Sequence, residues 1–161
     1  MKRARIAVLL GIATGLTAAS VSAWADDVVR WKTIIGIIQA GNVVGNITGG
    51  GQPWSTTGGE AKVNLSNNRI EFNVRGLVLA GGNTIGTPGA INQVKGTIIC
   101  NAGTTNSTAD TPLVELSATG DAQFSGETTT PIPPDCAPSN IAFLVRIAAN
   151  RWIANGSVRN D

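Results

Sequence analysis

Hydrophobic and polar residues alternate along most of the chain after residue 27, with the period of two that is typical of half-buried β-strands. The clearest case spans residues 60–79, where the alternation is interrupted at Asn67-Asn68. Asn tolerates a positive φ, so we predict a two-residue hairpin loop there. This loop would place the apolar residues of the hairpin on one face, in the pairs Leu65–Ile70, Val63–Phe72 and Ala61–Val74.

The same pattern predicts two further hairpins and three strands. One hairpin joins residues 141–147 to 152–158 through a loop at Ala149-Asn150, with the pairs Ile147–Trp152, Val145–Ala154 and Ile141–Val158. The other joins residues 113–118 to 122–127 around Thr119-Gly120-Asp121, and it would set Leu116 opposite Phe124. The three strands are expected at residues 28–38, 43–48 and 94–100.

A succession of about nine short strands with turn residues between them predicts an all-β fold. We expect a single domain, residues 26–161, built as an antiparallel β-sandwich of immunoglobulin-like or jelly-roll-like type. A β-barrel is the alternative, because it too consists of many short antiparallel strands. Long loops are expected at residues 49–59, 80–93, 101–112 and 128–138, and loops on a rigid sheet are common places for function.

Residues 1–25 have the layout of a secretory signal peptide. Three basic residues come first, an apolar stretch follows at residues 6–19, and Ala23-Trp24-Ala25 forms an A-x-A cleavage site. We predict cleavage after Ala25, with cleavage after Ala23 as the alternative. The apolar stretch is shorter than the roughly 20 residues of a membrane span, which disfavours an uncleaved anchor. The sequence therefore predicts a secreted protein, periplasmic or extracellular, without a membrane span after cleavage.

Charge and composition exclude several classes of function. The chain has 12 basic and 10 acidic residues, and three of the basic ones lie in the leader, so the exported chain is close to neutral. No cluster of Lys and Arg remains to bind nucleic acid. The chain contains no His, which excludes Ser-His-Asp and Cys-His catalysis and any zinc site that uses His.

Carboxylates are the remaining candidates for catalysis or metal binding. A pair of them could hydrolyse glycosides, but most lie on the polar phase of strands or in turns. Asp26-Asp27 and Asp110 could contribute to a calcium site, yet no run of alternating acidic residues is present. The sequence thus predicts a protein that is not an enzyme and has no metal and no cofactor, with a carboxylate hydrolase as the weakest alternative.

Cys100 and Cys136 are the two cysteines of the chain, 36 positions apart. Export places them in an oxidising compartment, and their spacing is unlike the C-x-x-C of redox and metal sites. We predict a disulfide. Because Cys136 lies in the Pro-rich segment 128–138, the bond would attach a loop to the end of the strand that carries Cys100.

Trp54 is the most suggestive residue for binding. It lies with Gln52 in the Gly-rich loop 49–59, where a tryptophan could contact a sugar or a partner protein. These two residues and Asp110 are our speculative ligand contacts. The competing interpretation is that Trp54 folds back and closes the open end of the sandwich. Trp31 and Trp152 share strand phases with Ile35 and Ile147, so both are expected in the core.

The leading functional hypothesis is a secreted or envelope-associated, non-catalytic structural or interaction domain with an unidentified protein or carbohydrate partner. The alternative is a small carbohydrate- or ligand-binding module that uses Trp54. A third possibility comes from residues 28–38, which are apolar on both phases near their end and could pair with a neighbouring subunit by strand exchange.

Overall fold

The computed structural model describes residues 27–101 and 106–160, so the predicted leader lies outside the described residues. Strands dominate this part of the chain, and one short 3₁₀ helix, η1 (Pro138–Asn140), precedes the strand that begins at Ile141. The strands are β1 (Val28–Gly36), β2 (Val43–Val44), β3 (Ile47–Thr48), β4 (Trp54–Ser55), β5 (Gly58–Asn64), β6 (Arg69–Arg75), β7 (Val78–Leu79), β8 (Gln93–Cys100), β9 (Ser107–Asp110), β10 (Val114–Glu115), β11 (Ala122–Glu127), β12 (Ile141–Ile147) and β13 (Trp152–Asn160).

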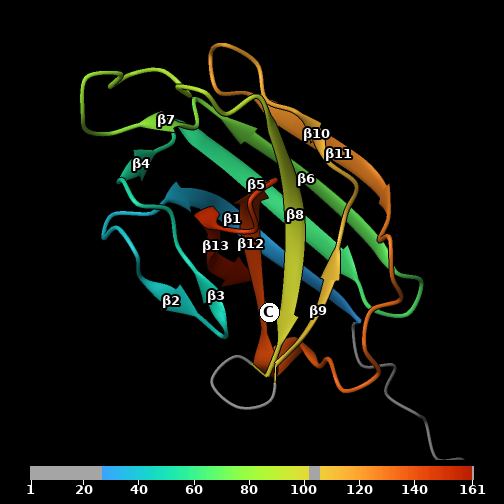
Figure 1. Cartoon of the computed structure of the whole chain (residues 1–161). Helices are drawn as coiled ribbons and strands as arrows, with labels where there is room; N and C mark the ends of the chain where they lie inside the picture. The colour runs from blue at the N-terminus through green and yellow to red at the C-terminus, as the bar shows by residue number, and fades with distance from the viewer. Residues whose placement is uncertain (1–26, 102–105, 161) are drawn as a thin grey trace, which may run out of the picture.

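Nine of these strands form one antiparallel sheet in the order β10-β8-β12-β13-β1-β5-β6-β11, with β9 also paired to β8. The sheet curls so that β8 and β12 lie across from β5 and β6 (Figure 1). The prediction of an all-β antiparallel fold with one disulfide is confirmed. The parts of the molecule that lie across from each other, β8–β12 and β5–β6, therefore belong to one continuous sheet rather than to two separate sheets (Figure 1).

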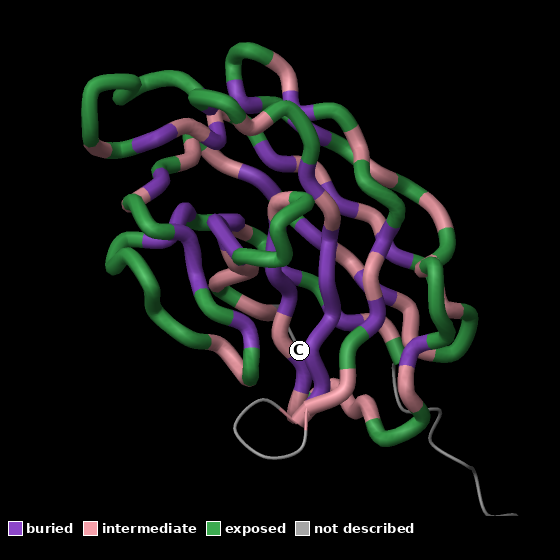
Figure 2. Tube along the Cα trace, in the orientation of Figure 1, coloured by how far each residue is buried: buried purple, intermediate pink, exposed green. Residues whose placement is uncertain are grey.

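The core lies inside the curl and is aromatic at its centre. The Phe72 and Phe143 rings are 5.6 Å apart, although three strands separate β6 from β12 in the sheet order. Trp31 packs on Phe143 at 5.7 Å, and Trp31 and Trp152 are both buried as predicted. Figure 2 shows the buried residues along the strands and the exposed ones in the connecting loops.

The segment after β1 folds back over β13 and creates the surroundings of Trp54. The amide of Ile37 donates to the carbonyl of Ile153, and that of Gly50 donates to the carbonyl of Trp152. The indole nitrogen of Trp152 donates to the carbonyl of Asn42 at 3.1 Å. Residues 43–48, expected as one strand, are instead the hairpin β2–β3, because Gly45 turns the chain with a φ of 56°.

The register predicted for the β5–β6 hairpin is wrong by two residues. Val63 pairs with Ile70 and Ala61 with Phe72, because the turn contains four residues, 65–68, rather than two. The side chain of Asn64 accepts the amide of Ser66 and holds this longer turn. A shift of two leaves every side chain on its predicted face, which is why the alternation could not reveal it.

The C-terminal hairpin follows the prediction up to a bulge. Val145 pairs with Ala154 as expected, but Arg146 rather than Ile147 pairs with Trp152. The register shifts between Val145 and Arg146, as at a β-bulge, and Arg146 is buried there, as Leu144 is on the same phase of β12. The pairing between β12 and β13 ends at Leu144, so the expected pair of Ile141 with Val158 is not formed.

The third predicted hairpin is not formed. Its turn is present, but its two strands pair with other strands rather than with each other. The amide of Ser117 donates to the carbonyl of Asp121, which closes the turn. β10 then pairs with β8, and β11 pairs with β6, so that Phe124 lies opposite Phe72 instead of Leu116. The two sides of this turn are therefore the two ends of the curled sheet.

β1 is a central strand, paired with β13 on one edge and β5 on the other, and it ends at Gly36 rather than at residue 38. Among the described residues its two edges are thus filled by the chain itself. Ile35, which shares a sequence phase with Trp31, is 37% exposed, because the alternation of burial shifts after Lys32.

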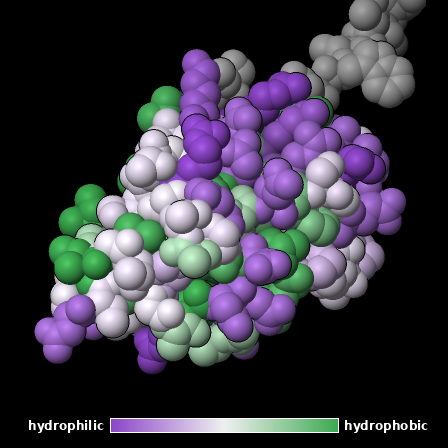
Figure 3. Space-filling model, turned by 90° about the horizontal axis from the view of Figure 1, so that it is seen from above, coloured by the Kyte–Doolittle hydropathy of each residue, from purple (hydrophilic) through white to green (hydrophobic). Residues whose placement is uncertain are grey.

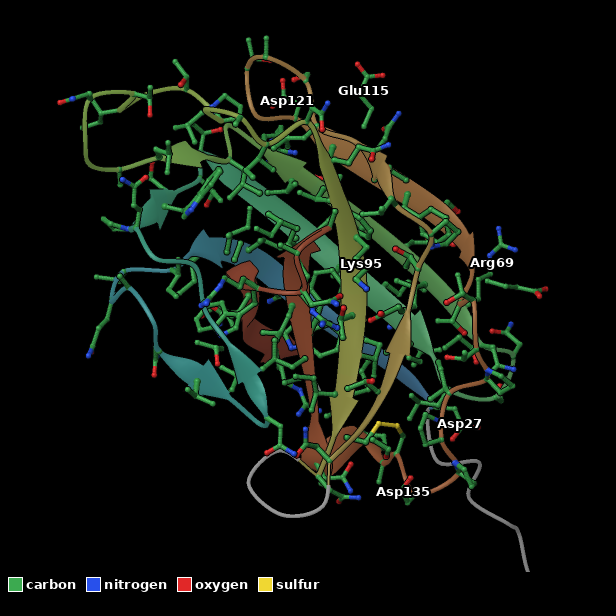
Figure 4. The ribbon with its side chains drawn as sticks, viewed as in Figure 1. Asp27, Arg69, Lys95, Glu115, Asp121 and Asp135 are labelled. Carbon is green, nitrogen blue, oxygen red and sulfur yellow. A yellow bond between two sulfur atoms is a disulfide. The ribbon has the colours of Figure 1, made fainter. Side chains whose placement is uncertain are left out.

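The disulfide joins Cys100, the last residue of β8, to Cys136 in the Pro-rich loop, as predicted. Asp135 strengthens the same attachment by accepting hydrogen bonds from Asn101 and Ser107 (Figure 4). In the described part of the chain, no helix has the length and apolar character to cross a membrane. A disulfide fits an extracellular or periplasmic compartment.

Asp121 stabilises the turn at the two sheet ends, and its titration is testable. Its pKa is lowered below the usual 3.8, mainly because the carboxylate accepts the amide of Gly76 and secondarily because it accepts the hydroxyl of Thr119. A carboxyl with a lowered folded pKa stabilises the fold above its unfolded pKa, and this contribution is lost as the pH falls through the folded value.

We therefore expect the side-chain carboxyl signal of Asp121 in NMR spectra to titrate below 3.8. The acid-induced loss of stability should be shallower in Asp121→Asn, because that variant has no proton to take up. Gln123→Asn on β11 changes an exposed residue without a titratable group, so it is the control and should keep the wild-type acid dependence. A titration midpoint of Asp121 at or above 3.8 would contradict this assignment.

Candidate functional site

A groove of about 590 Å³ lies beside Trp54, between the small β4–β7 sheet, the following loop and the β12–β13 turn. It is lined by residues of the segments 50–54, 79–91 and 147–153, and we call it the Trp54 groove. Its volume is in the range of small-molecule sites. In the view from above, patches of hydrophobic surface lie between polar side chains (Figure 3).

Trp54 is fixed in the wall of this groove by its backbone. Its amide donates to the carbonyl of Ile37 at 2.8 Å, and it pairs with Leu79 of β7. Gly36 permits this approach, since a Cβ there would overlap the carbonyl of Trp54. The side chain is 6% exposed, so Trp54 is mostly buried as the competing interpretation expected, and at the same time it contributes to the groove.

The segment 79–91 forms the opposite wall and is internally bonded. The amide of Leu79 donates to the carbonyl of Thr87 at 2.9 Å, and the amide of Gly86 donates to the carbonyl of Leu79, also at 2.9 Å. The hydroxyl of Thr87 donates to the carbonyl of Thr84, and Pro88 is buried. These internal hydrogen bonds give the loop a defined backbone conformation, which fixes the position of this wall of the groove.

The floor of the groove is apolar. Its large side chains are those of Trp54, Leu79, Ile91, Ile147 and Ile153. All of them are buried or partly buried against the main core. An apolar group that lies on this floor would be removed from water on the side that faces the protein, which is an ordinary source of affinity.

Two donor groups of the groove lie next to the consecutive residues Gly49 and Gly50. Arg151 Nη1 donates to the carbonyl of Gly49 at 3.1 Å, which anchors the guanidinium there. The indole nitrogen of Trp54 is 3.6 Å from the point that a Cβ on Gly50 would occupy. Within the described residues this indole N–H has no hydrogen-bond partner, and Arg151 has no ion pair.

Gln52 also lines the Trp54 groove, so the structure brings two of the three predicted ligand contacts together. Asp110 lies elsewhere, on β9, which pairs with β8. It accepts hydrogen bonds from Lys95 at 2.6 Å, Thr97 at 2.7 Å and Arg146 at 3.2 Å. Asp110 thus neutralises two cations that join β8, β9 and β12, and Figure 4 shows Lys95 at the middle of β8.

A second hollow, of about 830 Å³, lies over the polar faces of β1, β5, β6 and β11. Both Glu60 and Glu71 line it, but each is engaged by a neighbour. Asn73 donates to Glu60 at 2.9 Å, and Lys62 lies 3.8 Å from Glu71. Interspersed charges of both signs are usual on the solvent side of an antiparallel sheet.

Arg151 and the wall 79–91 are the parts of the groove that sequence reasoning missed. Arg151 stands in a hairpin turn, where a charged residue is unremarkable. The long loop 80–93 was recognised as a place for function, but no pattern in it indicates which strand it faces. The Gly-rich loop 49–59 was the signal that identified Trp54, and it carries no information about Arg151 or about the segment 79–91.

Comparison of this chain with protein-family models, with curated proteins and with solved structures finds no match.

Proposed function

We propose that the protein is an exported, non-catalytic interaction domain that holds a small ligand in the Trp54 groove. The observation that carries this proposal is the convergence at one place of an apolar floor, an indole N–H without a partner and a loop-built wall. The indole N–H is not among the described buried polar atoms that lack a partner, so it is open to solvent and accessible to a ligand.

The non-catalytic part of the proposal is supported by the groups that line the groove. None of them is a carboxylate, a thiol or an imidazole, so the groove offers neither a general base nor an activated nucleophile. The depth of Trp54 also bears on the ligand. With 6% of its surface exposed it offers no open ring face, which disfavours stacking on a flat sugar ring.

Binding can be tested with 1-octanol, a neutral apolar probe with one hydrogen-bonding oxygen. We expect its addition to shift the indole N–H signal of Trp54 and the amide signals of residues 79–91 in ¹H–¹⁵N NMR spectra. Gly50→Ala should weaken binding about tenfold or more, because its methyl group would lie 3.2 Å from Cγ2 of Ile153, displace that side chain of the floor and cover the indole nitrogen from 3.6 Å.

Gly51→Ala is the matched control, because a Cβ on Gly51 meets nothing within 4 Å. It should bind octanol within about twofold of the wild type. The proposal is wrong if octanol shifts signals elsewhere and leaves those of Trp54 in place, or if the two Gly variants bind equally well.

A further inference from the structure

We infer that the ligand of the Trp54 groove is an amphipathic anion, namely a free apolar chain that ends in a carboxylate. This inference rests on the proposed function and adds the chemical class of the ligand. It follows from the charges and hydrogen-bonding groups that line the groove, and from their positions along it.

The charge of the groove is of one sign. Arg151 is the sole charged residue of the lining, and no Asp or Glu belongs to it. Within the described part of the chain, no carboxylate lies within ion-pair distance of Arg151. An anion would therefore find an uncompensated guanidinium at the groove, and a cation would find repulsion.

The two donors lie next to consecutive residues. Arg151 is anchored on Gly49, and the indole N–H of Trp54 lies at the adjacent Gly50. A carboxylate has two acceptor oxygens, so one group can accept from both donors. The floor, which includes Leu79 and Ile147, offers large apolar side chains and no charge, so an apolar chain fits it better than a second charged group does.

A free alkyl carboxylate fits these conditions better than the C-terminus of a peptide does. A peptide would carry an amide at every residue along the apolar floor, and each buried amide without a partner is costly. The alkyl chain carries no polar group away from its charged end. Its charged group would thus meet the guanidinium of Arg151, and its chain would lie on the apolar floor.

The test compares four probes by isothermal titration calorimetry on the purified, disulfide-bonded protein at pH 7: octanoate, 1-octanol, octylammonium and the peptide N-acetyl-Ala-Leu-Leu with a free carboxylate. We expect octanoate to bind about tenfold tighter than octanol, and octylammonium to bind more weakly than octanol. Arg151→Gln should bring octanoate down to the affinity of octanol, and Arg151→Lys should retain part of the difference.

Arg30→Gln is the matched control, because it removes an exposed arginine from the polar face of β1 and should change nothing. Thermal unfolding of each variant verifies that the fold is intact. Equal binding of octanol and octanoate, or an unchanged preference in Arg151→Gln, overturns the anion assignment while the groove itself stands. Tighter binding of the peptide overturns the choice of ligand, and failure of all four probes removes the proposed function too.

Discussion

Replacing Asp110 by Asn should lower the free energy of unfolding by about 3 kcal/mol, because it leaves two cations of a partly buried cluster without their counter-ion. Arg146 is 8% exposed, and the side chain of Lys95 is 15% exposed. Both form ion pairs with the same carboxylate, at 3.2 and 2.6 Å. Equilibrium unfolding in urea measures the loss.

Glu127→Gln is the control for this variant. Glu127 is exposed on β11 and forms no ion pair among the described residues, so its replacement should cost less than about 0.5 kcal/mol. A second variant separates charge from packing. Adding Arg146→Met to Asp110→Asn removes one of the two cations that have lost their counter-ion, and it should recover part of the lost free energy of unfolding. Equal stability of Asp110→Asn and Glu127→Gln would show that the ion pairs of Asp110 contribute little to the free energy of unfolding.

The second large effect is expected from the disulfide. The double variant Cys100→Ala/Cys136→Ala should lose about 3–4 kcal/mol, because a closed loop of 36 residues restricts the unfolded chain. Denaturant unfolding of the variant against the oxidised wild type gives the difference. Alanine is chosen because Cys100 is fully buried and a serine hydroxyl there would add a separate cost.

Reduction of the wild-type protein is the independent measurement. Dithiothreitol should bring the wild type close to the stability of the double variant and should leave the variant unchanged. A loss below about 1 kcal/mol in both experiments would mean that Asp135 and its hydrogen bonds hold the Pro-rich loop without the disulfide.

The sequence was sufficient for the strand pattern and insufficient for the details that place side chains. Alternation identified β5, β6 and the faces of Val63 and Phe72, because burial of one face of a strand imposes a period of two. It could not distinguish a two-residue turn from a four-residue one, since both keep the faces. Nor could it reveal the register shift beside the buried Arg146, because such a shift depends on pairing with another strand.

The candidate site shows the same division. Trp54 and Gln52 were identified because a tryptophan in a Gly-rich loop is unusual, and both line the groove. Asp110 was included as an isolated carboxylate that could bind a cation such as calcium, whereas its three hydrogen-bond partners are protein groups from two other strands. Arg151 was missed for the converse reason, because its position beside Gly49 depends on a contact between residues about a hundred positions apart.

The most direct test of the central claim is a nuclear Overhauser spectrum of the ¹⁵N-labelled protein with octanoate. The account predicts cross-peaks from the indole N–H proton of Trp54 to the methylene protons next to the carboxylate. It also predicts cross-peaks from the methyl groups of Leu79 and Ile153 to the rest of the chain. Cross-peaks to octanoate from other parts of the protein, with none from Trp54, would contradict the claim that the Trp54 groove is the binding site.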